Sequence, residues 1–253
     1  MMTTPNPIES EIEELLRNRG IRMLGIARAG QLPSVPAPFS PQAILEGARS
    51  VICYGVPIPK GVLYADSGAL ALYWRYCNML YRSLDMATNE LCVLLEEKGY
   101  LASPIYGCYP WKIVDREFWG LLPLVFWAEQ AGLGKLTQCG LLAHPRYGTR
   151  ILLAGVVTTS SLQPSEKLTA QVCPEDCRLC LDACPASAID ETGKVSHNAC
   201  IRHSGANPLL ALVLRDSVLK DKFPFETIVN TVGVDDHGAY TCFKCVEVCP
   251  LNQ

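Results

Sequence analysis

Hydrophobic and polar positions along the chain predict helices that alternate with buried strands over residues 1–165. Apolar residues recur every three or four positions in two stretches, 8–19 and 70–98, which is the spacing of an amphipathic helix. Two continuous apolar runs, 50–56 and 150–158, have the length of buried strands. Shorter elements are predicted at 22–27 (strand), 101–105 (extended) and 122–130 (helix). Strands that alternate with helices favour an α/β sandwich.

Glycine, serine and proline mark the ends of these elements. Gly20 and Gly99 follow the two amphipathic stretches, and glycine is common just after a helix. Ser67 is a candidate N-cap for the longer helix. Prolines concentrated in residues 31–42 predict a loop between the first two strands.

Eight of the thirteen cysteines lie in the last 81 residues, in two broken groups. The first is C-x3-C-x2-C-x3-C-P, from Cys173 to Pro185; the second is a separate Cys200 followed by C-x2-C-x3-C-P, from Cys242 to Pro250. Both end like the bacterial ferredoxin run, whose fourth cysteine ligates the other of two clusters. The spacing therefore predicts two 4Fe–4S clusters with crossed ligands. The predicted ligands are Cys173, Cys177, Cys180 and Cys249 for one cluster, and Cys184, Cys200, Cys242 and Cys245 for the other.

Two departures from the ferredoxin run leave alternatives open. The first gap has three residues instead of two, and Cys200 is separated from the rest of its group, so the ligand roles of Cys173 and Cys200 are open. Zinc sites favour two C-x2-C pairs, which does not account for the repeated C-x3-C-P. Disulfides require an oxidising compartment, and the first twelve residues show no export signal.

Composition limits the classes of function. Hydrophobic residues make up 49% of the chain and charged residues 19%, which indicates a globular protein with a sizeable core. A net charge of −3 gives no indication of nucleic-acid or anionic-membrane binding. No apolar run approaches the ~20 residues of a membrane span. Oxygen-sensitive clusters without an export signal lead us to expect the cytoplasm of an anaerobic or facultative organism.

A glycine-rich stretch between residues 131 and 150 is a candidate cofactor loop. Its glycines allow a backbone to approach a flat ligand closely. The pattern lacks the strand and G-x-G-x-x-G context of a dinucleotide site. The glycine pattern by itself favours a turn-rich connection between a helix and a strand. The glycines of this stretch are Gly132, Gly134, Gly140 and Gly148.

Taken in order, four segments resemble a known family over roughly residues 20–253. They read EGARSVICYGVPIP (46–59), KGYLASPIYG (98–107), AGLGKLTQCGLLAHPRYGTRILLAGVVTT (131–159) and the doubled cysteine run with CLDACPASAI. This order is similar to that of the cobalamin-dependent epoxyqueuosine reductases and respiratory reductive dehalogenases. The chain looks like a short, divergent member of that superfamily.

The resemblance implies both a fold and a cofactor. It implies a nitroreductase-like α/β sandwich at residues 1–165 that holds a base-off corrinoid, followed by a ferredoxin-like domain at 166–253 with the two 4Fe–4S clusters. No D-x-H-x-x-G segment occurs, so a histidine ligand replacing the corrinoid's lower base is not expected. The residues that the resemblance places at the corrinoid are Gly132, Gly134, Cys139, Gly140, Leu141, Tyr147 and Gly148.

The chain departs from the family at its proton donor. Epoxyqueuosine reductases carry an Asp-Thr-Ala-Pro-like stretch before AGLG, and the matching region near 118–121 has no aspartate. The helical-repeat extension that accompanies tRNA binding and the export signal of the respiratory dehalogenases are also not found, so the substrate does not transfer. The candidate proton donors are Tyr73, Tyr76, Tyr106 and Tyr109, with Lys112 and Asp115 as charge partners.

Several of the candidate residues have a purely structural alternative explanation. Helical spacing favours core positions for Tyr73 and Tyr76, whereas Tyr106 and Tyr109 lie in a loop, where active-site groups are commoner. The four histidines lack metal-ligand spacing. The five cysteines outside the two groups are expected to be small buried residues, with Cys108 and Cys139 as possible exceptions in the pocket loops. The predicted catalytic residues are Tyr73, Tyr76, Tyr106 and Tyr109, together with Lys112.

We therefore expect an oxidoreductase that passes electrons from two 4Fe–4S clusters to a corrinoid cobalt and reduces a small substrate. It would need a low-potential donor of the ferredoxin or flavodoxin type, and neither a nucleic acid nor a membrane span is expected. Two rivals remain: a non-catalytic corrinoid-binding, reducing or trafficking protein, and a plain 4Fe–4S electron-transfer protein. The missing proton-donor motif favours the first rival.

Overall fold

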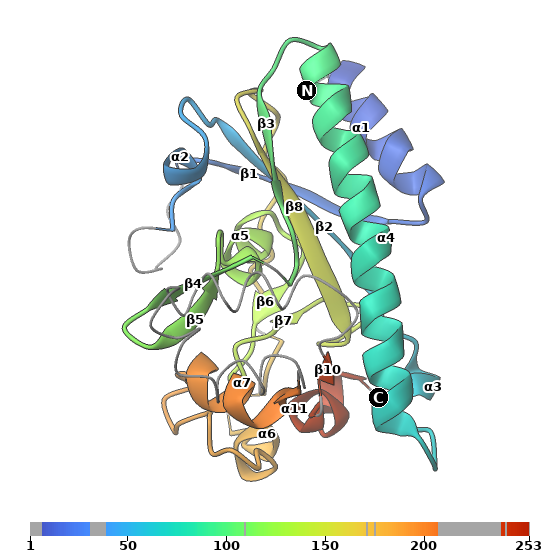
Figure 1. The fold of residues 1–253 in the computed structure, drawn as a ribbon, viewed down its shortest axis with the longest axis vertical. Coiled ribbons are helices and arrows are strands. Elements are labelled where there is room, and N and C mark those ends of the chain that lie inside the picture. The colour runs from blue at the N-terminus through green and yellow to red at the C-terminus, as the bar shows by residue number, and fades with distance from the viewer. Residues whose placement is uncertain are drawn as a thin grey trace, which may run out of the picture.

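A four-stranded antiparallel sheet with the strand order β1-β2-β8-β3 forms the centre of the molecule (Figure 1). The computed structural model describes residues 7–30, 39–108, 110–170, 172–174, 176–206, 239–240 and 242–252. The four strands are β1 (Met23–Arg28), β2 (Ser50–Pro57), β8 (Ile151–Thr158) and β3 (Ala102–Ile105). Each lies where the sequence predicts a strand or an extended segment, which confirms a mixed α/β fold.

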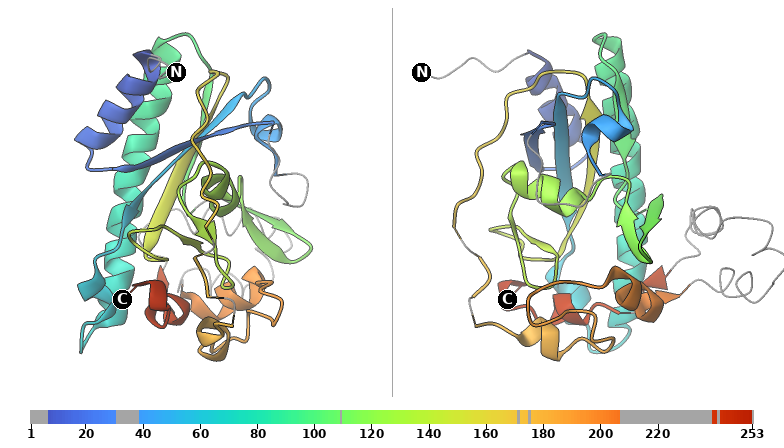
Figure 2. Two further views of the ribbon diagram at one scale, coloured as in Figure 1. Left: turned by 180° about the vertical axis from the view of Figure 1, so that it is seen from behind. Right: turned by 90° about the vertical axis from the view of Figure 1, so that its left-hand side faces the viewer.

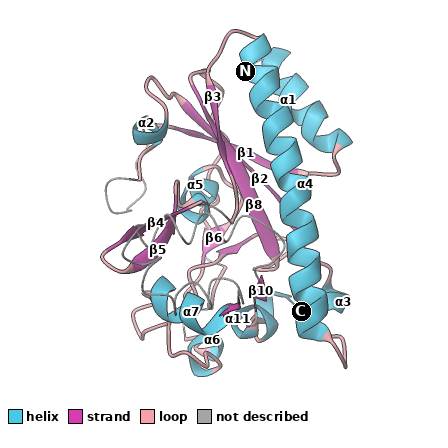
Figure 3. Cartoon of the chain, viewed as in Figure 1, coloured by secondary structure: helices cyan, strands magenta, loops and turns pink. Residues whose placement is uncertain are grey.

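Two long helices lie along one side of the sheet, and several short helices gather beyond one end of it (Figures 1 and 3). The predicted helices at 8–19, 70–98 and 122–130 are confirmed within a few residues. The helices are α1 (Pro7–Asn18), α2 (Pro41–Ile44), α3 (Lys60–Leu63), α4 (Ala69–Glu97), α5 (Leu124–Gln130), α6 (Leu179–Asp182), α7 (His197–Ser204), α11 (Lys244–Glu247) and a 3-10 turn (Pro250–Asn252).

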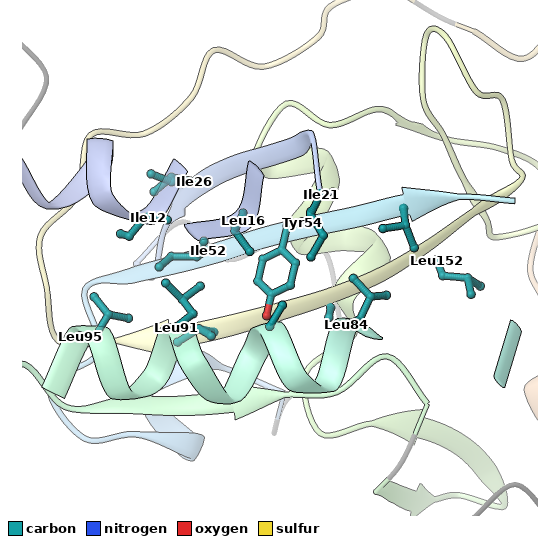
Figure 4. Close-up of a cluster of buried hydrophobic side chains, with 14 of the residues drawn as sticks. Ile12, Leu16, Ile21, Ile26, Ile52, Tyr54, Leu84, Leu91, Leu95 and Leu152 are labelled. Carbon is teal, nitrogen blue, oxygen red and sulfur yellow. The ribbon is translucent and has the colours of Figure 1, made fainter. Parts of the chain in front are cut away.

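The two central strands are buried on both faces. Alternate side chains of a strand point to opposite faces of its sheet. Ile52 and Tyr54 of β2 therefore join the core beneath α1 and α4, while Val51 and Cys53 join the core beneath α5. Figure 2 shows the sheet between α4 and α5, and Figure 4 shows the core on the α1 and α4 side. This burial explains why β2 and β8 are continuous apolar runs.

The boundaries of α4 differ slightly from the prediction. The N-cap position is Gly68, with φ +75°, and no side chain caps the helix there, so the prediction of Ser67 as N-cap is wrong. Gly20 and Gly99 follow their helices with φ +76° and +84°, as predicted. Within the described part of the chain, no helix has both the length and the apolar character to cross a membrane.

A hairpin that the sequence did not predict extends from the sheet. It consists of β4 (Trp111–Val114) and β5 (Glu117–Gly120), which pair in antiparallel register. The two turn residues, Asp115 and Arg116, have φ +51° and +66°, the left-handed conformation that a tight hairpin turn requires. Such turns usually contain Asn or Gly, so this turn carries little sequence signal.

Two further strand pairs are short. Strands β6 (Lys135–Leu136) and β7 (Leu142–Ala143) enclose a five-residue turn from the glycine-rich stretch. Strands β9 (Gly205–Ala206) and β10 (Ala239–Tyr240) pair in antiparallel register, although they are more than 30 residues apart in sequence. In Figure 1 the β6–β7 pair lies between the sheet and the helices α6 and α7, and β10 lies beside α11.

An extended segment connects β8 to the cysteines (Figure 2). Ser165 fixes its path along β1: its amide donates to the Ile26 carbonyl at 2.9 Å, and its hydroxyl accepts from the Ile26 amide at 3.0 Å. Residues 173–206, the first cysteine segment, carry α6 and α7, and residues 242–252, the second cysteine segment, carry α11. The predicted boundary at residue 165 lies in this connection and stays a prediction.

Candidate functional site

The two C-x2-C-x3-C-P motifs adopt matching local structures. In each motif the middle cysteine lies on a four-residue helix, Cys180 on α6 and Cys245 on α11. The third cysteine then closes a turn: the Cys184 amide donates to the Leu181 carbonyl and the Cys249 amide to the Val246 carbonyl. Helices α6 and α11 pack against each other, so the two motifs face one another.

The first predicted ligand set is close enough to interact electrostatically. The Cys180 thiol interacts with those of Cys173 and Cys177. Cys249, although it belongs to the second motif, interacts with Cys173 of the first. Burial raises the pKa of the Cys249 thiol, so it holds a proton at neutral pH that iron binding would displace.

The second predicted ligand set is connected in the same way. The Cys245 thiol interacts with those of Cys200 and Cys242. Cys200, which is exposed, in turn interacts with Cys184, the last cysteine of the first motif. Cys184 also accepts a hydrogen bond at its sulfur from the Ala188 amide, at 3.3 Å. The neighbours of Cys180, Cys200, Cys245 and Cys249 include members of their own predicted ligand sets. The crossed ligand assignment itself stays a prediction.

The donors in both cysteine segments are thiols, which suit iron. None of the thirteen cysteines, all of which lie in the described part of the chain, forms a disulfide. Within the described residues, no three His, Cys, Asp or Glu side chains converge on one position that could hold a single metal ion. The four thiolates of a 4Fe–4S cluster bind four different iron atoms. The two 4Fe–4S clusters stay a prediction.

Helix α7, which carries Cys200, is fixed by the β4–β5 hairpin. The Glu117 carboxylate accepts hydrogen bonds from the Ser196 hydroxyl and the Asn198 amide, both at 2.8 Å. An acceptor with a negative charge stabilises the N-terminus of a helix. Trp119 contacts the His197 ring edge-on, with centroids 4.9 Å apart. These contacts position Cys200 despite its distance in sequence from the other ligands, and sequence analysis missed them.

The end of the second cysteine segment is tied to the start of β8. Asn252 is fully buried. Its side-chain oxygen accepts from the Thr149 amide at 2.9 Å, and its nitrogen donates to the Thr149 hydroxyl at 2.9 Å and to the Val246 carbonyl at 2.6 Å. Thr149 also hydrogen-bonds to Cys249. One pair of side chains therefore fixes a predicted cluster ligand to the sheet.

Helix α4 contacts the same segment through Tyr73. The Tyr73 ring stacks on that of Phe243, with centroids 4.8 Å apart. Phe243 lies between Cys242 and Cys245 in the chain. The Tyr73 hydroxyl hydrogen-bonds to Cys77, one turn further along α4. Tyr73 and Tyr76 both pack against the core beneath α4, which agrees with the alternative that they are core residues.

The glycines of residues 131–150 approach protein atoms closely. A Cβ at Gly132 would lie 2.0 Å from the Glu166 carbonyl oxygen, and one at Gly134 would lie 2.4 Å from that of Ala143. At Gly148 it would lie 2.2 Å from the Asn252 side chain. These glycines thus allow close packing of the connection, the β6–β7 pair and the second cysteine segment. They do not line an open cradle for a flat ligand, and their assignment to a corrinoid stays a prediction.

The remaining predicted residues around this stretch have mixed surroundings. Gly140 would place a Cβ 3.0 Å from Val195 of the first cysteine segment. Leu141 packs beside the cysteines, with partners in both segments. Tyr147 is half-buried and lies against the guanidinium groups of Arg146 and Arg150, 5.4 and 5.6 Å from its ring centroid.

The predicted proton donors have different neighbours. Tyr106 is 38% exposed at the end of β3, and burial together with the nearby Asp85 raises its pKa. Lys112 lies on β4, with its amine 5.8 Å from the centre of the Phe39 ring. Tyr109 lies outside the described residues.

Sequence analysis missed Asp85. This residue lies on α4, where one side-chain oxygen is buried without a hydrogen-bond partner in the described structure. Burial raises the pKa of its carboxyl group to about 6. A charged residue within the Tyr73, Cys77 and Tyr81 face of a long helix is the sequence signal that could have identified it. The carboxyl lies near Tyr106 and is suited to hold a proton near neutral pH.

Asn252→Ala is predicted to destabilise the fold by about 1–3 kcal/mol, because it leaves the buried Thr149 amide and Val246 carbonyl without partners. Equilibrium denaturant unfolding measures the change. The exposed Asn89 provides a matched control, and Asn89→Ala should leave the free energy of unfolding within about 0.5 kcal/mol of the parent. Equal stabilities for the two variants would contradict the role of Asn252.

Asp85→Asn is predicted to change how stability depends on pH. The carboxyl titrates at about 6 in the folded chain, above its ordinary value of 3.8. Between these values the folded state binds more protons, so the group makes stability fall as pH rises from about 4 to 6. The variant should lack this fall and gain about 1 kcal/mol at pH 7.5, allowing for partial exposure. Unfolding curves across pH test this, with exposed Asp66→Asn as the control; parallel curves for parent and Asp85→Asn would contradict it.

Known proteins share this sequence and fold. The epoxyqueuosine reductase of Bacillus subtilis (strain 168) is 30% identical over 99% of the chain, which spans 59% of that relative's length. The structure of epoxyqueuosine reductase from Streptococcus thermophilus has a TM-score of 0.63 at 20% identity, covering 98% of this chain and 66% of that one. No protein-family model matches.

Two further structures bear on cofactor and partner. A reductive dehalogenase whose structure suggests a mechanism for B12-dependent dehalogenation has a TM-score of 0.57 at 16% identity, covering 81% of this chain and 30% of that one. An epoxyqueuosine reductase has been solved with a modified tRNA stem loop, at 21% identity and a TM-score of 0.59, covering 97% of this chain and 65% of that one. This neighbour's tRNA complex conflicts, in part, with the expectation that no nucleic acid is involved. The chain is thus similar in sequence to the epoxyqueuosine reductases, and it shares its fold with them and with a reductive dehalogenase.

Proposed function

We propose that this chain is a cobalamin-dependent iron–sulfur reductase. Two 4Fe–4S clusters pass electrons to a base-off corrinoid, which reduces a small substrate. One cluster is held by Cys173, Cys177, Cys180 and Cys249, and the other by Cys184, Cys200, Cys242 and Cys245.

The observation that carries this proposal is the crossed interaction of the eight thiols. Cys249 of the second motif lies near Cys173 of the first, and Cys184 of the first lies near Cys200, which interacts with Cys242 and Cys245. Crossed ligands of two clusters require such neighbours. Donors aimed at sulfur, such as the Ala188 amide on Cys184, would stabilise the thiolates.

The fold would serve this function as two units. We propose that the sheet and its helices form a nitroreductase-like sandwich at residues 1–165, and that residues 166–253 form a ferredoxin-like lobe. The contacts of Glu117 with α7 and of Thr149 with Asn252 support a fixed distance between the lobes. A fixed distance matters because the clusters must deliver electrons to the second centre.

A bound corrinoid supplies strongly nucleophilic, low-potential cobalt, and the protein supplies access and protons. Its proposed contacts are Gly132, Gly134, Cys139, Gly140, Leu141, Tyr147 and Gly148. Several of these glycines already contact protein, so we derive no step through the corrinoid from them. Support for this cofactor comes from the B12-dependent relative of the same fold.

Protons would come from the partly exposed end of β3. We propose Tyr106 as the donor, with Asp85 beside it as the group that restores its proton; the raised pKa of Asp85, about 6, allows the exchange near neutral pH. Tyr109, in the same loop, stays a second candidate. The other proposed catalytic residues are Tyr73, Tyr76 and Lys112.

One observation favours a second candidate function. Because the glycines pack against protein atoms, the chain could carry electrons through its clusters without holding a corrinoid. In that case it is a 4Fe–4S electron-transfer protein. Cobalt content separates the two functions directly.

The proposed partners follow from the chemistry. Low-potential clusters need a low-potential donor, of the ferredoxin or flavodoxin type. The absence of disulfides among the thirteen cysteines, all within the described residues, is typical of a reducing compartment, so we propose the cytoplasm. A relative was solved with an epoxyqueuosine-modified tRNA stem loop, but the net charge of −3 leads us to propose a small molecule as substrate.

Anaerobic reconstitution with iron, sulfide and cobalamin tests the proposal through metal analysis and the visible spectrum. We predict about eight irons per chain, from two four-iron clusters, and about one cobalt. Cys180→Ala should lower the iron content by about four, while Cys92→Ala, outside both motifs, should not change it. Eight irons without cobalt would support the electron-transfer candidate, and about one iron or zinc per motif would contradict both.

A substrate assay then uses the reconstituted chain with a chemical reductant. Reduction of small halogenated or epoxide compounds is the predicted outcome, and Tyr106→Phe should lower the rate by ten-fold or more without changing the cobalt content, since proton transfer contributes about 10²–10⁴-fold. Tyr100→Phe, at another exposed tyrosine, is the control. Turnover of the modified tRNA stem loop instead would contradict the choice of a small substrate.

A further inference from the structure

Cys139 belongs to neither cysteine motif, yet it touches the middle cysteine of each. It lies in the turn between β6 and β7 and is 7% exposed. Its sulfur forms side-chain hydrogen bonds with both Cys180 and Cys245. It packs in one buried cluster with Cys180, with Cys245 against it, and so lies beside a predicted ligand of each proposed iron–sulfur cluster.

The turn holds the Cys139 sulfur in a defined place. The Thr137 amide donates to the Leu141 carbonyl at 2.9 Å, and the Gly140 amide donates to the Thr137 carbonyl at 3.0 Å. Gly140 has φ +72°, which favours glycine at this corner. The Thr137 hydroxyl lies 3.2 Å from the Cys139 sulfur. The sulfur is thus positioned by backbone contacts and not by a flexible surface loop.

The neighbours of Cys139 come from both predicted ligand sets. Cys180 is in the first set and Cys245 in the second. Cys249 and Cys200, again one from each set, also interact electrostatically with Cys139. Buried side chains of the first cysteine segment, among them Ile189, surround the group and keep it from water.

Without iron, the Cys139 sulfur accepts these hydrogen bonds, which lower the pKa of its thiol and raise the pKa of the Cys180 and Cys245 thiols. Iron binding at Cys180 and Cys245 would reverse this direction. Cysteines that bind iron do so as thiolates and have no proton to donate. If Cys180 and Cys245 hold clusters, the donor left among these three thiols is the S–H of Cys139. A donor that is not a ligand would then face both clusters.

We propose that Cys139 is a ninth cysteine of the cluster site, a positioning residue that binds no iron and donates a hydrogen bond to cluster sulfur at the junction of the two clusters. The inference rests on the proposed function, because it requires both clusters to be present. A hydrogen bond to cluster sulfur stabilises the reduced, more negative cluster and so raises its reduction potential. Cys139 would thereby set the potential at which electrons leave this pair.

The test compares Cys139→Val and Cys139→Ser in the full chain, reconstituted anaerobically. Valine is close in size and has no donor, whereas serine keeps one. Redox titration followed by electron paramagnetic resonance should show at least one cluster shifted to a more negative potential in Cys139→Val, with Cys139→Ser closer to the parent. Cys53→Val, buried beneath α5, is the matched control and should leave both potentials unchanged.

Three outcomes would overturn the inference. Unchanged potentials in Cys139→Val would mean that the thiol does not act on either cluster. A loss of about four irons in both variants, with the circular dichroism spectrum kept, would make Cys139 a ligand. An equal shift of the reduction potential in Cys53→Val would show that the shift comes from altered core packing and not from the Cys139 thiol. Failure of the proposed function is distinct, because it appears in the parent chain as a missing set of four irons.

Discussion

The structure depends on holding eight thiols together from two segments that are distant in sequence. Buried thiols give little cohesion of their own, so other contacts must set their positions. The buried pair of Thr149 and Asn252 fixes the end of the chain to β8, and Glu117 fixes the helix of Cys200. Tyr73 stacks on Phe243 from a third direction. Each contact joins the cysteines to the scaffold of the sheet, which is itself rigid because β2 and β8 are buried on both faces.

The sequence predicts the parts of this fold that follow from burial and spacing. Strands β2 and β8 and helix α4 were predictable because an apolar run or a helical period records which faces are covered. The crossed thiol sets follow from the ferredoxin spacing and stay a prediction. The β4–β5 hairpin was not predictable, because its Asp115-Arg116 turn lacks the usual residues. Neither was the cap of Glu117 on α7, since the two lie about 80 residues apart and no local pattern connects them.

The glycine-rich stretch shows how one sequence pattern serves different structural purposes. Gly132 and Gly148 were candidates for a ligand cradle, yet their missing side chains make room for the Glu166 carbonyl and for Asn252. Glycine allows close approach of any backbone or ligand, and only the three-dimensional neighbours identify which. The same stretch brings Cys139 to the cysteines, so it connects the sheet to the proposed clusters.

The crossed assignment of ligands is the central claim, and a pair of double variants tests it most directly. Iron content is measured after anaerobic reconstitution of Cys180→Ala/Cys249→Ala and of Cys180→Ala/Cys245→Ala. Crossed ligands predict that the first double variant loses one cluster and keeps about four irons, while the second loses both. If each motif instead holds its own cluster, both double variants lose all their iron, and that result would contradict the account.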